Sequence, residues 1–486
     1  MSKKAENAFY ITTTLPYVNA DPHIGFAMEL VRADVVARYK QMTGYDVFFN
    51  TGTDEHGAKI HEKALETGVD PQAYVDEAAQ KFKGLVELLG ISPEVHFIRT
   101  TDEHHEAAAQ AFWRRCNEKG DIYKGVYEIK YCVGCELEKT ESDLNEEGRC
   151  PIHPTRELEI REEENYFFRF SKYADALLKL YDSTPDFVIP DFRQGEIRAF
   201  VERGLEDFSV SRLKEKMPWG IEVPDDPEHV MYVWFDALVN YVSTLGWPED
   251  EEMFEKYWVN GTPTQYAGKD NLRQQSAMWQ AMLMSAGLPN SRQIIINGFI
   301  TSGGQKMSKS LGNVISPHEI VEKYGTDALR YYLVRELQPF EDSDFTQERF
   351  AEAYNANLAN GLGNLVSRIM KMAETHLTEA PDVSKRESTI PQDFKDAFER
   401  FDLQAASDSV WEHIQAIDGK IQETEPFKLI KTDSERAKEI IAELVLDLYG
   451  VADMLSPLMP ATSTAIKEAV KTNTKPETLF PRIDVN

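Results

Sequence analysis

The sequence predicts an α/β protein in which a parallel β-sheet is split by a long insertion and followed by a bundle of helices. Three patterns predict this class. Strand-like and helix-like runs alternate at the start of the chain, another strand-like run appears only much later, and apolar residues recur at helical spacing beyond about Glu341. Strand, helix and strand joined by short links are typical of a parallel βαβ unit.

The N-terminal unit should contain two strands and one helix. Phe9 to Leu15 is rich in aromatic and β-branched residues, and Asp46 to Asn50 (DVFFN) is a second short apolar run, so both are expected to be strands. Between them, the pattern from Ile24 to about Gly44 predicts a helix. The buried face of that helix follows steps of three and four residues: Met28, Val31, Val35 and Tyr39.

Two later regions complete the pattern. Gln293 to Asn297 (QIIIN) is expected to be another strand of the same sheet, which makes roughly Asp121 to His229 an insertion ending at the acidic, proline-rich EVPDDPEH. Beyond Glu341, three amphipathic helices predict a bundle. Their apolar faces are Leu358, Leu362, Leu365, Ile369 and Met372; Trp411, Ile414, Ile417 and Ile421; and Ile441, Leu444, Leu448, Val451 and Leu455.

Composition limits the kind of protein. The 486 residues include 53 Lys and Arg against 82 Asp and Glu, a net charge of −29. This charge argues against general coating of nucleic acid, although local basic patches could still bind it. The chain contains no apolar run of about 18 residues, and its start does not resemble a secretory signal, so we expect no membrane contact and a cytoplasmic location.

The segment PHIGF, Pro22 to Phe26, lies where the first strand gives way to the helix. A helix N-terminus presents unpaired N–H groups and partial positive charge, both of which favour phosphate. Gly25 would let a ligand approach the backbone, and His23 can donate to a phosphate oxygen. A plain turn explains the same residues, so this segment alone does not establish a phosphate site.

A second candidate phosphate loop, TSGGQKMSKSLGN, follows the QIIIN strand. Lys306 and Lys309 flank Met307 and Ser308, and two glycines precede them. Such a loop could close over a triphosphate and offset the charge that develops as pyrophosphate leaves. An exposed basic loop is the alternative interpretation, and the GxxxxGK[ST] pattern of P-loop proteins is absent.

Together, HIGF and KMSKS resemble the paired signatures of class I aminoacyl-tRNA synthetases, whose usual forms are HIGH and KMSKS. Four more stretches make the resemblance closest to the methionyl-tRNA synthetases: PYVNADPHIG, GTDEHG, YVWFDALVNY and KYGTDALRYYL. The matches keep the same order over nearly the whole chain. The resemblance implies a split Rossmann-like catalytic sheet, a helical anticodon-binding domain, and L-methionine, ATP with Mg²⁺, and tRNA(Met) as partners.

The resemblance also implies roles for individual residues. His23, Gly25, Lys306 and Lys309 would be catalytic, and with Asp270 and Ser308 they would bind ATP. Asp54 would pair with the ammonium group of methionine, as expected in a partly dry pocket. The other residues of the methionine site would be Leu15, Tyr17, Trp234, Leu238, Tyr241, Gln274 and Gln275.

A zinc site is predicted inside the insertion. Cys132-x2-Cys135, fourteen residues, then Cys150-x2-His153 supplies four ligands at zinc spacing. A redox CxxC is the alternative, but it would not need the second pair. Methionyl-tRNA synthetases carry a zinc knuckle in this same insertion, which supports a structural Zn²⁺.

In the helical tail, Asn364, Arg368 and Phe427 match anticodon-reading positions of the family, and a solvated helix face is the alternative for the first two. Three departures from the family stand out. Phe26 replaces the second histidine of HIGH, Gln274 and Gln275 replace an aromatic residue and a histidine, and Phe427 replaces a tryptophan that usually stacks on a base.

These observations predict a methionine–tRNA ligase acting as a monomer. The rival hypotheses are a class I synthetase for another apolar or sulfur amino acid and a non-catalytic tRNA-binding module. The expected parts are a catalytic domain in two halves (1–120 and 230–325, the second with the KMSKS loop), a connective insertion with the zinc knuckle (121–229), a stem-contact linker (326–355) and the anticodon-binding bundle (356–486).

Overall fold

The computed structural model describes residues 7–483, apart from 20, 133–136, 140–143, 146, 152–154, 156, 308–312 and 386–389. Its centre is a six-stranded sheet in the order β3–β2–β1–β12–β13–β7, with every neighbouring pair parallel. The strands are β1 (Ala8–Thr13), β2 (Asp46–Thr53), β3 (His96–Arg99), β7 (Val188–Ile189), β12 (Thr262–Gly268) and β13 (Gln293–Asn297). The expected split sheet is confirmed, because β1 pairs with the distant β12.

One strand of this sheet comes from within the range expected to be an insertion. β7 pairs with β13 at the sheet edge, although residues 121–229 were expected to lie outside the sheet. The rest of that range forms two antiparallel sheets, ordered β5–β4–β6–β8 and β10–β11–β9. Their strands are β4 (Ile122–Cys132), β5 (Leu137–Lys139), β6 (Glu159–Phe168), β8 (Phe208–Ser209), β9 (Ser211–Leu213), β10 (Glu222–Val223) and β11 (Asp226–Met231). The helices of this range are η2 (Phe170–Tyr173), α5 (Ala174–Ser183) and α6 (Asp191–Glu202).

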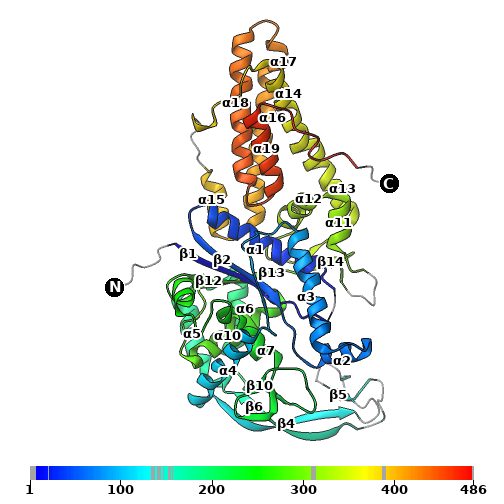
Figure 1. The fold of residues 1–486 in the computed structure, drawn as a ribbon, viewed down its shortest axis with the longest axis vertical. Helices are drawn as coiled ribbons and strands as arrows, with labels where there is room; N and C mark the ends of the chain where they lie inside the picture. Colours follow the sequence, from blue (N-terminus) through cyan, green and yellow to red (C-terminus); the bar gives the residue numbers. More distant parts are fainter. Residues whose placement is uncertain are drawn as a thin grey trace.

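Helices cover both faces of the central sheet, and one of them, α1 (Ile24–Met42), lies between the sheet and the C-terminal bundle (Figure 1). The other elements around the sheet are α2 (Ala58–Thr67), α3 (Pro71–Leu88), α4 (Glu103–Glu118), α7 (Val233–Leu238), α8 (Asn240–Ser243), α9 (Glu251–Phe254), η3 (Glu255–Val259), η4 (Lys269–Asn271), η5 (Gln274–Met278) and α10 (Trp279–Ala286). None of the helices in the described ranges is long and apolar enough to cross a membrane.

A small sheet and several short helices lead into the bundle. The sheet has the order β15–β14–β16. Its strands and the helices after it are β14 (Ile300–Ser302), β15 (Gln305–Lys306), α11 (Pro317–Tyr324), α12 (Thr326–Tyr331), η7 (Tyr332–Glu336), β16 (Ser343–Asp344) and α13 (Gln347–Ala353). The bundle elements are η8 (Tyr354–Gly363), α14 (Asn364–His376), η9 (Val383–Lys385), α15 (Gln392–Glu399), α16 (Leu403–Thr424), α17 (Pro426–Leu429), α18 (Ser434–Leu455) and α19 (Pro460–Thr472).

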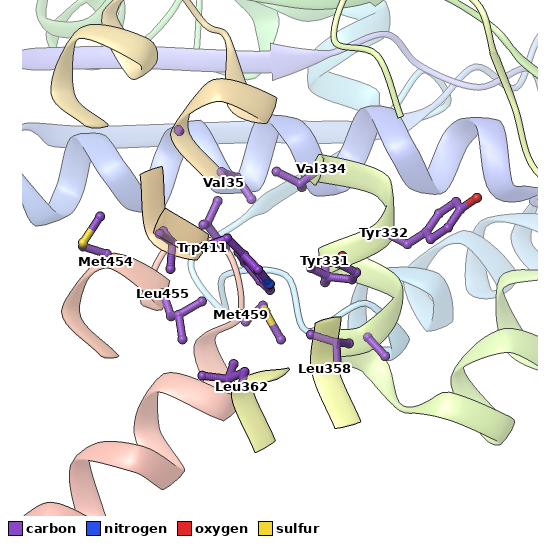
Figure 2. Packing of buried hydrophobic residues seen from close by; sticks show 14 of the residues in the cluster. Val35, Tyr331, Tyr332, Val334, Leu358, Leu362, Trp411, Met454, Leu455 and Met459 are labelled. Carbon is purple, nitrogen blue, oxygen red and sulfur yellow. The ribbon is translucent and has the colours of Figure 1, made fainter. Parts of the chain in front are cut away.

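The three apolar helix faces predicted from the sequence pack against one another, and all of their residues are buried except Met372, which is half-buried. Figure 2 shows this core where it meets α1: Val35 of α1 lies near Val334 of η7, Trp411 of α16 and Leu455 of α18. The ring centroids of Tyr331 and Trp411 are 4.9 Å apart. The sheet and the bundle therefore share one continuous apolar core.

A buried ion pair fastens the bundle to α1. Arg330 of α12 is fully buried and donates to Asp34 of α1 at 2.8 Å. Its remaining hydrogen bonds go to three backbone carbonyl oxygens: those of Leu89, Pro457 and Leu458. Asp34 also accepts from Arg38 and from the Ser92 backbone N–H. One carboxylate thus joins α1, the turn after α3 and the helix that leads into the bundle.

A second buried arginine, Arg32 of α1, lies in the same region. Arg32 donates to four backbone carbonyl oxygens, those of Leu333, Leu337, Gln338 and Pro339. Carbonyl groups at a helix end have no partner within the helix, so a side chain that supplies donors stabilises the end. Arg32 does this at the end of η7.

Removing the Asp34 charge should destabilise the protein strongly. In Asp34→Asn, the buried Arg330 guanidinium keeps its charge without a counter-ion, which costs about 3–5 kcal/mol. Urea unfolding followed by fluorescence should show this as a lower midpoint. Glu439→Gln, which removes the partner of the exposed Arg436, is the control and should leave the midpoint in place. Equal midpoints for wild type and Asp34→Asn would contradict the structural role of the pair.

Candidate active site

Two adjoining cavities open at the carboxyl ends of the central strands, the edge at which open parallel sheets bind ligands. The first, of about 280 Å³, lies over the start of α1, and the second, of about 310 Å³, extends toward the end of β2. They share a wall made of Thr14, Pro16, Tyr17, Asp270 and Asn271. Two ligands seated in them would therefore lie next to the same five residues.

In the first cavity, His23 is the N-cap of α1. Its Nδ1 accepts from the Gly25 N–H at 3.1 Å, which assigns the ring proton to Nε2 in the neutral imidazole. The other N–H groups of this helix start are also paired, Ile24 with the Ile315 carbonyl and Phe26 with the His23 carbonyl. The phosphate-binding helix start expected from the sequence is thus capped by its own histidine in the free protein.

Gly25 is required by this cap. A Cβ at this position would lie 2.9 Å from His23 Cε1 and 3.1 Å from Nδ1, closer than real Cβ contacts allow. The same Cβ would meet Met307 of the KMSKS segment at 4.0 Å, and the Ile315 contact follows that segment in the chain. The fold therefore brings the two sequence signatures together. Lys306 ends β15, while its side chain and the whole of Ser308 and Lys309 lie outside the described residues.

Phe26 packs rather than presenting a polar group to the cavity. Its ring meets that of Phe82 on α3 edge to face, with centroids 5.4 Å apart. Both rings line the first cavity. An edge-to-face pair contributes about 0.5–1.5 kcal/mol beyond the area it buries.

Glu29 is a site residue that the sequence analysis missed. It lies on α1, lines the first cavity, and accepts from the Thr14 N–H at 2.8 Å and the Thr14 hydroxyl at 2.6 Å. Burial, opposed by these hydrogen bonds, raises the pKa of Glu29 from its ordinary 4.5 to about 8. The signal available in the sequence was an acid inside a helix otherwise rich in apolar residues.

In the second cavity, Asp54 follows β2 and lies beside Tyr17, since a bridge continues the parallel pairing beyond the strands. Asp54 is 7% exposed, and its buried Oδ1 has no hydrogen-bond partner in the described part of the chain. Burial, followed by the charges of Asp236 and Glu55, raises the pKa of Asp54 well above its usual range. A buried acceptor of this kind favours a cationic ligand.

The other predicted methionine-site residues line the same cavity. Leu238 and Tyr241 are buried, whereas Trp234 is 43% exposed and lies at the cavity wall. The full set that the structure brings together is Leu15, Tyr17, Asp54, Trp234, Leu238, Tyr241, Gln274 and Gln275. Asp270 belongs to both cavities, between the two groups of residues.

The two residues after Asp54, Glu55 and His56, form ion pairs with residues from other parts of the chain. Arg99 donates to both oxygens of Glu55 at 2.8 Å, and His56 Nδ1 lies 3.1 Å from Asp236. Burial raises the pKa of Asp236, but the charge and hydrogen bonds of His56 and His105 lower it below its ordinary value. Across the described ranges, no group of three or more metal-ligating side chains occurs.

The four residues of the expected zinc site fall mostly outside the described part of the chain. Cys135 and His153 lie outside it, and of Cys132 only the backbone, at the end of β4, is described. Cys150 is buried and follows a tight turn in which Asn145 accepts from the Gly148 N–H at 2.9 Å.

The three anticodon-site candidates lie in the bundle. Asn364 begins α14 and lines a cavity with the C-terminal segment, and Arg368 lies one turn later, where it donates to Asp418 of α16 at 2.6 Å. Phe427 belongs to α17, directly after α16, and is 46% exposed.

Comparisons with known proteins all point to the methionine type of class I tRNA synthetase. A family profile described as tRNA synthetases class I (M) matches residues 9–158 and 138–370. The chain is 44% identical to the methionine–tRNA ligase of Thermotoga maritima, over 96% of this chain and 76% of that protein, and 42% identical to the one from a Nostoc species, over 95% and 90%. It also resembles the methionyl-tRNA synthetase of Mycobacterium tuberculosis in complex with methionyl-adenylate, with TM-score 0.84, 33% identity, and coverage of 98% and 99% of the two chains.

The raised pKa of Glu29 predicts a pH-dependent difference between wild type and Glu29→Gln. The folded protein binds the Glu29 proton more tightly than the unfolded chain, so this stabilisation is present below pH 4.5 and is lost as pH rises toward 8. Within that window, wild type should lose roughly 1.4 kcal/mol per pH unit relative to the variant. Thermal unfolding of both proteins between pH 5 and 9 tests this, and parallel curves would contradict it.

Proposed function

Since the chain belongs to the class I tRNA synthetase family of the methionine type, we propose how its own residues perform the reaction of a methionine–tRNA ligase. The enzyme activates L-methionine with ATP and transfers it to the 3′ end of tRNA(Met). The observation that carries the residue assignment is the pair of adjoining cavities, one at the start of α1 and one lined by Asp54, whose buried Oδ1 has no hydrogen-bond partner among the described residues.

In the first step, a carboxylate oxygen of methionine attacks the α-phosphorus of ATP. A new oxygen–phosphorus bond forms, the bond to the bridging oxygen of the β-phosphate breaks, and pyrophosphate leaves with that electron pair. In the second step, a ribose hydroxyl at the tRNA 3′ end attacks the carbonyl carbon and AMP leaves. No protein nucleophile is needed, so catalysis consists of positioning and charge stabilisation.

Asp54 would hold the amino acid. Its buried Oδ1 accepts no hydrogen bond from any described residue, and the ammonium group of methionine would supply a donor together with a positive charge. The shared wall formed by Thr14, Pro16 and Tyr17 would then aim the methionine carboxylate at the first cavity. Leu15, Leu238 and Tyr241 would surround the thioether, which packs well against aromatic rings.

ATP would occupy the first cavity. His23 Nε2 and the Gly25 backbone are the donors at the helix start, and Lys306, Ser308 and Lys309 would approach from the loop that the fold brings to Gly25. Asp270, at the wall common to both cavities, would contact the ribose side of the nucleotide. ATP would enter as its Mg²⁺ complex.

The Zn²⁺ ion would have a structural role and no catalytic one. Cys132, Cys135, Cys150 and His153 supply four donors of the type and spacing that hold Zn²⁺, and the described part of the knuckle, with buried Cys150 after a tight turn, is compatible with that set. The ion would stabilise the fold of the insertion.

The chain would be divided as its sequence indicates. Residues 1–120 and 230–325 would form the catalytic domain, with β7 contributed from the insertion 121–229, and 326–355 would link it to the anticodon-binding bundle 356–486. Asn364, Arg368 and Phe427 would meet the anticodon, where an amide, a guanidinium and a ring suit unpaired bases. A monomer acting in the cytoplasm completes the proposal.

Asp54→Asn tests the assignment directly. Losing the charge partner of a buried ammonium should raise the KM for methionine by about 100-fold or more in ATP–pyrophosphate exchange, while the KM for ATP changes little. Asp175→Asn, on the exposed surface of α5, is the control and should behave as wild type. An unchanged methionine KM would refute the role of Asp54. Wild-type exchange with cysteine or leucine but none with methionine would refute the function itself.

Phe26→His tests the departure in the first signature. A second imidazole over the first cavity adds a donor to a charged ligand, so the kcat of pyrophosphate exchange should rise severalfold, even though the contact with Phe82 is lost. Phe26→Leu removes the same ring without adding a donor and should not raise kcat. No increase in Phe26→His would show that packing, not the missing donor, explains the phenylalanine.

A further inference from the structure

Three buried side-chain oxygens that line the second cavity have no hydrogen-bond partner among the described residues: Asp54 Oδ1, Gln274 Oε1 and Gln275 Oε1. The ammonium group of an amino acid accounts for the first. Methionine has no side-chain donor for the other two, because a thioether sulfur only accepts, and weakly. The wall formed by the two glutamines is therefore more polar than a methionine side chain requires.

The fold holds these amides in place. Gln274 and Gln275 begin η5, a π-helical turn, and π turns are frequent at functional sites. The Gln275 backbone carbonyl accepts from Gln280 at 2.8 Å, and only 2% of Gln275 is exposed. Burial raises the pKa of Tyr241, another residue of the cavity, and the amide N–H group of Gln275 opposes this rise by interacting with the phenol oxygen, which leaves Oε1 as the atom without a partner among the described residues. Gln275 is thus a buried polar residue held in position by its neighbours.

The amides and Asp54 lie at opposite ends of the cavity. Asp54 follows β2, and the glutamines follow β12, with β1 between these strands. Two strand spacings separate the elements by roughly 10 Å. An α-amino acid held at Asp54 would therefore direct the end of its side chain, not its ammonium group, toward Gln274 and Gln275.

We propose that Gln275, together with Gln274, adapts this pocket to α-amino acids of methionine's length whose side chain ends in a hydroxyl or another hydrogen-bond donor, alongside methionine. This inference rests on the proposed function. An apolar pocket discriminates only weakly by size, but a pocket with buried unpaired acceptors favours a ligand that brings a donor. A hydroxyl suits an amide in either orientation, since it both donates and accepts.

The test uses two probes that differ only at the chain end. L-norleucine replaces the thioether by methylene, and L-5-hydroxynorvaline has a hydroxyl in place of the norleucine methyl group. The kcat/KM of ATP–pyrophosphate exchange is measured for both with the full chain. Wild type should use the hydroxyl probe at least as well as norleucine, and Gln275→Met should shift the ratio toward norleucine by about tenfold or more.

Matched variants keep the result interpretable. Gln72→Met makes the same change at a half-buried position on α3 that lines neither cavity, and it should leave the wild-type ratio unchanged. Gln274→Met, at the half-buried neighbour, should shift the ratio in the same direction, and it serves as the readout if Gln275→Met does not fold. A wild-type preference for norleucine of tenfold or more, or a ratio that neither glutamine variant alters, would overturn the proposal.

Methionine-dependent pyrophosphate exchange distinguishes a failure of this inference from a failure of the proposed function. If wild type shows methionine-dependent exchange but the probe ratio fails as described, the specificity proposal is wrong and the ligase function stands. If methionine supports no exchange while the hydroxyl probe does, the function assigned to methionine fails and the polar pocket is supported.

Discussion

The water-excluded ion pair of Asp34 and Arg330 is the constraint on which the arrangement of the molecule depends. Both groups are fully buried, so each would be strongly destabilising without the other. Their hydrogen bonds reach α1, the turn after α3 and the turn between α18 and α19. Because the N-terminus of the same helix α1 forms the floor of the first cavity, the direction of the bundle and the position of His23 are set by one rigid element.

The active site follows from that placement and from the parallel sheet. Strands that end at one edge bring Thr14, Asp54 and Asp270 together although they are far apart in the chain. The region behind them is occupied by paired charges, chiefly Glu55 with Arg99 and His56 with Asp236. These pairs leave the unpartnered oxygens of the second cavity facing the space that a ligand would fill.

Local patterns predicted much of the fold because they report local physics. Gln293 to Asn297 forms the expected strand, and the apolar steps from Trp411 to Ile421 mark the buried face of α16. The same reasoning could not show that α1 is buried on nearly every side, with Arg32 and Asp34 inside, because their partners lie about three hundred residues away in sequence. Apolar periodicity has no means of identifying a charged residue whose burial depends on a distant counter-ion.

The site shows the same division. Asp54 and the aromatic residues around it could be grouped through the family resemblance, whereas Glu29 was missed because its burial results from the contact of Thr14 with α1. The capping of α1 by His23 was also invisible in the sequence. Since Nδ1 already holds the Gly25 N–H, the histidine is an internal competitor for any anion at this helix end. A phosphate that bound the Gly25 N–H would have to displace the imidazole, so any nucleotide seated at this helix start would compete with a contact that already exists within the protein.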